Sequence, residues 1–176
     1  MFGNVQIETK PYVGAPQTVA DIRRTALESQ HHYAVRQLVE RICQDLRSKD
    51  YLSEYLAINN FNFAHTRYMR DPRTTELVRA PYLVAEALLR GETPSLDCDD
   101  LTALTLAQCL AVGGHVRLVT VAFRKMVYRG EVQYSHVFAQ ALEPRQQIWV
   151  TLDPVAGLHT RDMHRRIVVA KVWPVA

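Results

Sequence analysis

The sequence predicts an α+β fold in which helices occupy the first part of the chain and antiparallel strands the last part. Between residues 18 and 90, apolar residues recur at three-to-four spacing, which is typical of amphipathic helices. Residues 97–112 are apolar nearly all round, which indicates a central, buried helix. After residue 116 the sequence changes to short runs rich in β-branched and aromatic residues, separated by turn residues, as expected for strands.

Four helices are predicted before residue 97, each with an apolar face, and three of them have a residue suited to a helix end. Thr18 and Asp50 are suited to the N-cap, Pro81 to a first helical turn, and Gly91 to a C-terminus. The predicted elements are an irregular lead-in over 1–17 with one short strand at 5–7, helices over 18–27, 33–47, 50–58 and 82–89, and a turn at 71–72.

The strands are predicted over 116–123, 131–142, 148–152 and 167–173, after Gly113 and Gly114 end the buried helix. Residues 129–130 and 143–146 are suited to hairpin turns. If 143–146 form a four-residue connection, Leu142 faces Gln147 and His136 lies directly opposite Asp153. A slip of one residue would send these two side chains to opposite faces of the sheet.

The bulk composition is that of an ordinary globular protein. With 176 residues the chain has the size of one domain, so we expect a single domain over 1–176, mainly helical over 18–90, with the buried helix and the sheet over 97–176. The formal net charge is only +3, without a block of basic residues, so nucleic-acid binding is not indicated. No apolar run approaches the ~20 residues of a membrane-spanning helix. The N-terminal residues also lack a secretory signal, so we expect a cytoplasmic protein without a membrane partner.

The three cysteines form neither a CxxC pair nor an even disulfide set. Cys98 and Cys109 are eleven residues apart on one predicted helix, roughly 16 Å along its axis and too far to bridge. Free thiols in a reducing compartment are therefore expected. Cys43 and Cys109 lie on apolar helical faces and are interpreted as packing residues.

Cys98 is the candidate nucleophile, because it lies in the first turn of the buried helix. Free N–H groups and the positive end of the helix dipole favour an anion there and lower a thiol pKa from its usual ~8.5. Asp97, Asp99 and Asp100 oppose this effect, so an imidazole partner is needed. His136 on a predicted strand and the carboxylate of the next strand complete a candidate Cys98–His136–Asp153 acyl-transfer site. Taken alone, a cysteine at a helix start is more often inert, aspartates at a helix start are usually caps, and a histidine on a strand is usually a surface or core residue.

The motifs around these residues resemble the bacterial transglutaminase-like superfamily. Residues 97–100 (Asp-Cys-Asp-Asp), with the apolar helix and the strand from residue 116, are similar to its nucleophile region. Residues 135–139 and 149–154 resemble its histidine strand and its aspartate strand. Upstream, residues 70–72 and 76–81 resemble segments of phage-encoded or prophage-encoded members, so that the resemblance covers about residues 20–155.

The resemblance implies a papain-like core, with Cys98 as nucleophile, His136 as general base and acid, and Asp153 as the residue that orients the imidazole. Relatives commonly carry glycine before the Asp-Cys pair, whereas this chain has Leu96, which narrows the approach to the sulfur. The superfamily contains proteases, amidases, cross-linking enzymes and members that have lost activity, so it does not name a substrate.

Neither a metal nor a cofactor is expected. The three aspartates could offer oxygen ligands to Ca²⁺, but neighbouring helical residues point apart and no calcium-loop motif is present. No cysteine or histidine pair has zinc spacing. For the oxyanion, the Cys98 N–H is the natural first donor, and a glutamine, asparagine or tyrosine side chain could be a further one. Asn59, Asn60 and Asn62 are weak candidates, more simply interpreted as turn formers. The remaining histidines are assigned to the surface or the core: His31, His32, His65, His115, His159 and His164.

The sequence therefore predicts cysteine-dependent acyl transfer on an amide, peptide or isopeptide bond of a protein or peptide substrate. Hydrolysis is preferred over transamidation, because water needs no dedicated amine site. The alternative is a non-catalytic phage or prophage structural or binding module that keeps the same scaffold.

Overall fold

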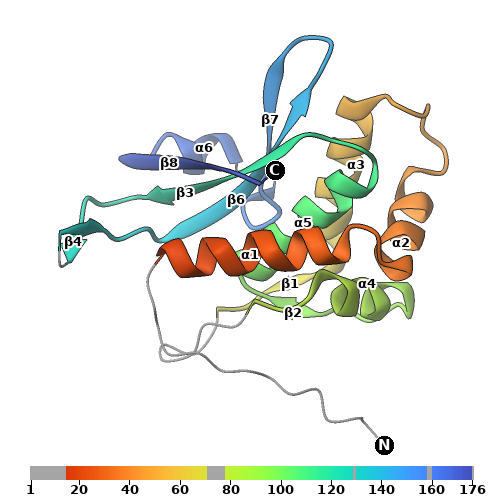
Figure 1. Ribbon diagram of the computed structural model, residues 1–176, viewed down its shortest axis with the longest axis horizontal. Coiled ribbons are helices and arrows are strands. Elements are labelled where there is room, and N and C mark those ends of the chain that lie inside the picture. Colours follow the sequence, from red (N-terminus) through yellow and green to blue (C-terminus); the bar gives the residue numbers. More distant parts are fainter. Residues whose placement is uncertain (1–14, 71–77, 129, 158–159, 176) are drawn as a thin grey trace, which may run out of the picture.

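The computed structural model describes residues 15–70, 78–128, 130–157 and 160–175. In this part of the chain, helices pack around one central helix and against a β-sheet (Figure 1). Several predicted features lie wholly or partly outside these residues: the lead-in over 1–17, the strand at 5–7, the turn at 71–72 and His159. The elements, in chain order, are α1 (Ala15–Ser29), α2 (Tyr33–Cys43), α3 (Tyr51–His65), β1 (Arg67–Tyr68), α4 (Pro81–Leu89), β2 (Ser95–Leu96), α5 (Cys98–Ala111), β3 (Val116–Ala122), β4 (Val127–Tyr128), β5 (Glu131–Val132), β6 (His136–Glu143), β7 (Ile148–Leu152), α6 (Thr160–His164) and β8 (Val169–Pro174).

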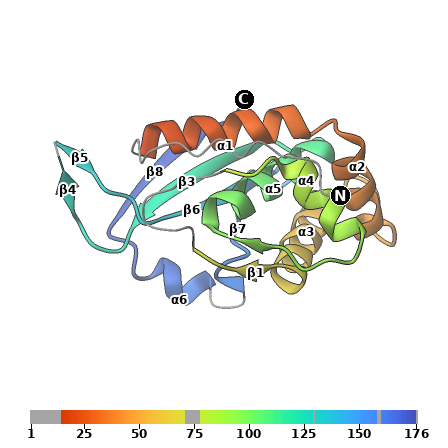
Figure 2. The ribbon, with the colours of Figure 1, turned by 90° about the horizontal axis from the view of Figure 1, so that it is seen from below.

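The main sheet has four strands in the order β7-β6-β3-β8, and every neighbouring pair is antiparallel. Helices thus precede an antiparallel sheet, and the α+β prediction is confirmed at this level. The prediction of one strand over 131–142 is wrong, because these residues form two separate strands, β5 and β6. Residues 131–132 pair with 127–128 in a separate β4–β5 hairpin that projects from the body, and β6 begins only at His136 (Figures 1 and 2).

Helix α5 is the centre of the molecule and contacts α1, α2, α3, α4, β3 and β6. Its side chains are buried almost all round, as its apolar sequence predicts. Asp97 caps the start, because its carboxylate accepts hydrogen bonds from the N–H groups of Asp99 and Asp100, both at 3.0 Å. At the other end, Gly113 has φ +85°, a left-handed conformation that glycine adopts readily.

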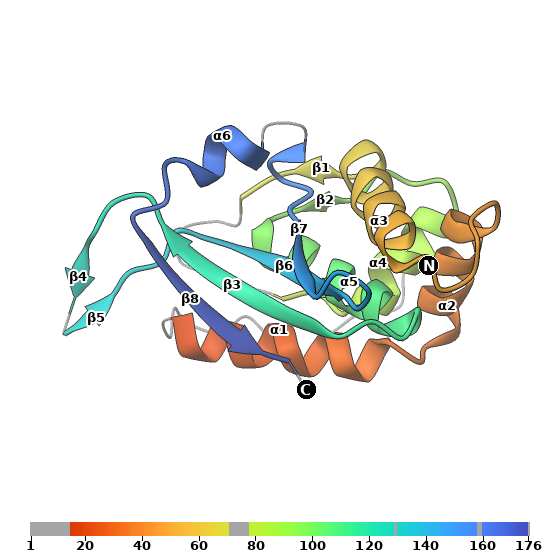
Figure 3. The same ribbon diagram turned by 90° about the horizontal axis from the view of Figure 1, so that it is seen from above.

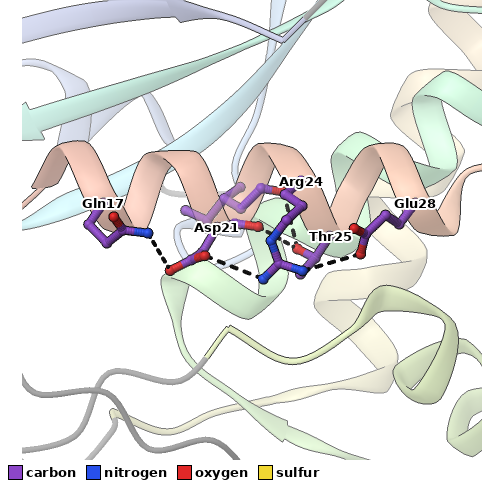
Figure 4. Close-up of polar contacts among 6 residues, drawn as sticks. Gln17, Asp21, Arg24, Thr25 and Glu28 are labelled. Atoms are coloured by element: carbon purple, nitrogen blue, oxygen red, sulfur yellow. Dashed lines mark hydrogen bonds and ion pairs between the residues drawn. The ribbon is translucent and has the colours of Figure 1, made fainter.

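Helix α1 runs along one side of the sheet, and α6 lies on the opposite side (Figures 2 and 3). The inner face of α1 buries Val19, Ile22 and Ala26 in the core. Its outer face carries a polar ladder in which Arg24 reaches Asp21 and Glu28, both at 3.3 Å (Figure 4). The sequence therefore fixes which side of α1 faces the protein.

The ends of three helices differ from the prediction. Helix α1 spans Ala15–Ser29 rather than 18–27, so residues 15–17 of the predicted irregular lead-in are helical and Thr18 lies inside the helix rather than at its N-cap. Helix α2 ends at Cys43 rather than at residue 47, and α3 continues to His65 rather than ending at residue 58. The extension of α3 is held by Asn62, which is fully buried and donates hydrogen bonds to Thr105 Oγ1 (3.1 Å) and Gln108 Oε1 (2.7 Å) on α5. This long-range polar contact leaves no trace in the local periodicity. Within the described residues, no helix is both long enough and apolar enough to cross a membrane.

Candidate active site

Cys98 is the first residue of α5, and its sulfur lies against β6. The Cys98 side chain is partly buried, and the thiol donates a hydrogen bond to Asp99 Oδ1 with a Sγ–O distance of 3.5 Å. The sulfur in turn accepts a hydrogen bond from the backbone N–H of Val137. Cys98 therefore lies beside the residue that follows His136 in the chain.

The start of α5 reaches β6 because β7 ends too early to cover it. The β6–β7 pairing extends only as far as Ala139 opposite Leu152, so Val137 lies beyond its end. Thr102, one turn after Cys98, donates through Oγ1 to the Val137 carbonyl at 3.1 Å. Two side chains of α5 thus bond the backbone of Val137 and hold the helix start against β6.

His136 and Asp153 form a buried hydrogen-bonded pair. The distance from His136 Nε2 to Asp153 Oδ2 is 2.8 Å, and the exposed fractions of the two residues are 8% and 0%. The other carboxylate oxygen of Asp153 accepts the backbone N–H groups of Val155 and Ala156 at 3.2 and 3.3 Å. The carboxylate is therefore fixed from both sides, and Nδ1 is the imidazole nitrogen left for another partner.

The strand register behind this pair differs from the predicted one. Glu143 belongs to β6 and pairs with Ile148, and continuing the register places Asp153 beside Phe138 rather than directly opposite His136. The carboxylate of Glu143 accepts the N–H groups of Arg145 and Gln146, which moves the four-residue turn to 144–147. The resulting displacement is two residues, so the side chains of His136 and Asp153 keep the same face and still meet.

The structure forms one of the two side-chain contacts expected in the predicted triad. His136 is bonded to Asp153, and Cys98 is bonded to the backbone of Val137. Between the described side chains of Cys98 and His136 there is no hydrogen bond, and the thiol donates to Asp99. The Cys98 N–H, at the first helical position, also has no acceptor within the described part of the chain.

The electrostatics of the thiol differ from the expectation for a helix start. Burial, followed by the negative charges of Asp99 and Asp97, raises the pKa of Cys98 well above its usual value. The hydrogen bond from Val137 N–H acts in the opposite direction but is the weaker effect. The predicted lowering by the helix dipole is therefore wrong for this arrangement, and the thiol is protonated at neutral pH.

Among the described residues, no hydrogen bond joins the asparagine candidates for an oxyanion donor to Cys98, His136 or Asp153. Asn59, Asn60 and Asn62 all lie within α3, so their interpretation as turn formers is wrong. Asn60 is exposed, and Asn62 is engaged with α5. Among the described residues, no group of three histidine, cysteine or acidic side chains could hold a metal ion.

His164 is a site neighbour that the sequence did not single out. Its ring stacks on Phe138 with centroids 4.8 Å apart, and the ring of Phe138 lies 6.1 Å from that of His136. Burial lowers the pKa of His164, while Asp153 raises it and His136 lowers it further, so the second imidazole lies within electrostatic reach of the pair. Only the packing of α6 against the sheet brings it there, and no local motif signals this.

Comparison with known proteins adds information about the fold. No family model matches the chain, and no curated protein matches it. A crystal structure of a candidate protease from Parabacteroides distasonis superposes with a TM-score of 0.58 at 13% identity, over 93% of this chain and 30% of that one. A candidate cysteine protease from Cytophaga hutchinsonii matches with a TM-score of 0.48 at 14% identity, over 92% of this chain and 54% of that one. The chain thus spans about a third and about half of these proteins, and the first of them shows that this fold occurs in a candidate protease.

Proposed function

We propose that this protein is a cysteine-dependent hydrolase of the transglutaminase-like, papain-like type, acting on an amide, peptide or isopeptide bond of a protein or peptide. The observation that carries the proposal is the 2.8 Å bond between His136 and Asp153, adjacent to the Val137 N–H that holds the Cys98 sulfur. The resemblance of residues 97–100, 135–139 and 149–154 to the family's motifs supports the same assignment.

In the proposed reaction, the Cys98 thiol exchanges Asp99 for His136 Nδ1 as its acceptor and passes its proton to that nitrogen. The sulfur attacks the substrate carbonyl carbon, and the C–O π electrons move to the oxygen, to which the Cys98 N–H donates a hydrogen bond. Asp153 stabilises the imidazolium through Nε2. The C–N bond then breaks, the amine leaves with the proton from Nδ1, and a thioester remains.

Water completes the turnover. His136 takes a proton from the water molecule, the hydroxide attacks the thioester carbonyl, and the Cys98 sulfur leaves and is reprotonated while the carboxylic acid departs. Transamidation would use an amine in place of water at this step. We prefer hydrolysis because water needs no binding site for a second substrate.

The second candidate is a non-catalytic phage or prophage structural or binding module that keeps the scaffold. One observation favours it: the Cys98 thiol is bonded to a carboxylate, and its pKa is raised well above its usual value. A thiol in that state is a weak nucleophile unless a base removes its proton.

An activated acyl donor separates the two candidates without knowledge of the substrate. p-Nitrophenyl acetate transfers its acetyl group to a reactive thiol and releases p-nitrophenolate, and peptide mass spectrometry identifies which cysteine is acetylated. In the hydrolase, Cys98 is acetylated faster than Cys43, and His136→Ala lowers its rate by about a hundredfold, as expected for the loss of a general base. His115→Ala removes an exposed imidazole and is the matched control. Acetylation of Cys98 at the rate of Cys43, unchanged in His136→Ala, would favour the non-catalytic module.

A further inference from the structure

A short parallel strand pair lies alongside the approach to Cys98. Strand β1 pairs with β2 so that Tyr68 lies beside Leu96, and the Met69 N–H donates to the Leu96 carbonyl at 2.8 Å. Figures 2 and 3 show β1 and β2 side by side next to the start of α5. Only Asp97 separates β2 from Cys98, so this pairing places Tyr68 next to the candidate nucleophile.

The Tyr68 hydroxyl has a defined polar environment. Its oxygen is hydrogen-bonded to the Arg70 guanidinium, and the phenol interacts electrostatically with Cys98 and Asp97. Because a guanidinium only donates, the phenol oxygen is the acceptor in this bond, and its own O–H remains a donor. Burial raises the pKa of Tyr68 more than the Arg70 bond lowers it, so the phenol keeps its proton at neutral pH. Tyr68 is 42% exposed, which leaves it accessible from the side of the solvent.

We propose that the Tyr68 hydroxyl is the second oxyanion donor, acting with the Cys98 N–H on the tetrahedral intermediate, and that Arg70 is the positioning residue for this hydroxyl. The inference rests on the proposed function, since it concerns the intermediate formed on Cys98. Two donors that converge on the oxygen hold it better than one. Tyr68 pairs with Leu96, two residues before Cys98, and its phenol interacts electrostatically with Cys98, whereas no hydrogen bond links the asparagines of α3 to Cys98.

The positive charge of Arg70 would also offset the negative charges around Cys98. A developing oxyanion beside Asp97 and Asp99 meets two carboxylates, which raise its energy. Arg79, another arginine near this helix start, is already engaged, with its Nε 3.6 Å from Asp100 Oδ2 and its backbone N–H donating to the same carboxylate. Through its bond to the Tyr68 hydroxyl, Arg70 polarises this O–H group and places a positive charge near the oxyanion.

Two reactions of the same thiol isolate this effect. Acetylation of Cys98 by p-nitrophenyl acetate passes through a tetrahedral oxyanion, while alkylation by iodoacetamide displaces iodide directly and forms no oxyanion. Both reactions need the thiolate. The ratio of the two Cys98 rates therefore reports stabilisation of the oxyanion, independently of how nucleophilic the sulfur is.

The experiment measures both rates for the full chain, for Tyr68→Phe, Arg70→Gln and Arg70→Lys, and for Tyr33→Phe as control, since Tyr33 is an exposed tyrosine at the start of α2. We expect Tyr68→Phe to lower acetylation about tenfold, below the 10²–10³ of a fully buried donor, with alkylation within about twofold of the parent. Arg70→Gln should show a smaller loss of the same kind, which Arg70→Lys restores in part.

Equal changes in both rates, or no change in either, in Tyr68→Phe would overturn the proposal. A loss of acetylation in Arg70→Gln that persists in a Tyr68→Phe background would remove Arg70 from its positioning role. Failure of the proposed function looks different: Cys98 of the parent protein would then be acetylated independently of His136, whatever the ratio in the Tyr68 variant.

Discussion

Replacing Asp99 by asparagine should lower the pKa of the Cys98 thiol and make this cysteine react at lower pH. Asp99 acts on the thiol in two ways, through its negative charge and by accepting the S–H hydrogen bond. Both effects favour the protonated sulfur, so the removal of the charge shifts the balance toward the thiolate. Asparagine preserves the size of the side chain, which limits any change in packing.

The size of the shift follows from the 3.5 Å separation between Sγ and Asp99 Oδ1. Coulomb's law gives about 5 kcal/mol for two unit charges at this distance with an effective dielectric constant of about 20, and about 1 kcal/mol in bulk water. The Asp99 side chain is only partly buried, so solvent screens its charge and the lower end applies. Since about 1.4 kcal/mol is a factor of ten in an equilibrium constant, we expect the thiolate fraction of Cys98, and with it the alkylation rate below the thiol pKa, to rise roughly five- to tenfold.

The assay is the rate of iodoacetamide alkylation of Cys98 as a function of pH, followed by peptide mass spectrometry. Cys43 is an internal reference, since burial, with a smaller effect of Glu54, raises its pKa to about 11. Asp45→Asn makes the same chemical change at an exposed position and should leave the Cys98 profile unchanged. A Cys98 profile in Asp99→Asn that coincides with that of the parent protein would refute the assignment of Asp99 as the group that keeps the thiol protonated.

Three further substitutions test other contacts described above. Thr102→Val removes the hydroxyl that donates to the Val137 carbonyl and leaves a buried acceptor unpaired, so urea unfolding should show a loss of about 1–3 kcal/mol, which Thr102→Ser recovers. Gly114→Ala would place a Cβ 2.5 Å from the Tyr55 hydroxyl oxygen, and unfolding should report a loss of about 1–3 kcal/mol. Burial lowers the pKa of His164, so its neutral form contributes stability that is present above the unfolded pKa of about 6.5 and lost as the pH falls. His164→Phe should therefore show a smaller drop in the urea midpoint between pH 7.5 and pH 5 than the parent protein, and an equal drop would contradict the shift.

The parts of the fold that local signals specify could be predicted from the sequence. The limits of α5 follow from the Asp97 cap and the glycines after residue 112, and the helix-to-strand order follows from the change in periodicity. Long-range contacts account for the errors. Residues 131–132 have strand character, but they pair with 127–128 outside the main sheet. The β1–β2 pair joins two-residue strands from distant parts of the chain, which no periodicity reveals.

The candidate site shows that the pairing of two side chains on neighbouring strands can be predicted more safely than the burial and hydrogen bonding of a single side chain. The prediction for His136 and Asp153 used a turn displaced by one residue, which changes the register by two and therefore keeps both side chains on one face. The error was harmless only because it was even. The state of Cys98, in contrast, depends on how deeply the sulfur is buried and on which acceptor the thiol finds, and both are tertiary properties.

The protonated state of the Cys98 thiol has a direct consequence for the proposed reaction. In the proposed mechanism, the nucleophile is a protonated thiol bonded to Asp99, and its base is an imidazole that Asp153 already orients. In such a site the proton must move from sulfur to Nδ1 as substrate binds, so reactivity depends on His136 more strongly than in a thiolate–imidazolium pair that exists at rest. The Asp99→Asn and His136→Ala variants should therefore act in opposite directions on Cys98, and the double variant should keep the lowered thiol pKa of the first while losing the acyl-transfer rate of the second.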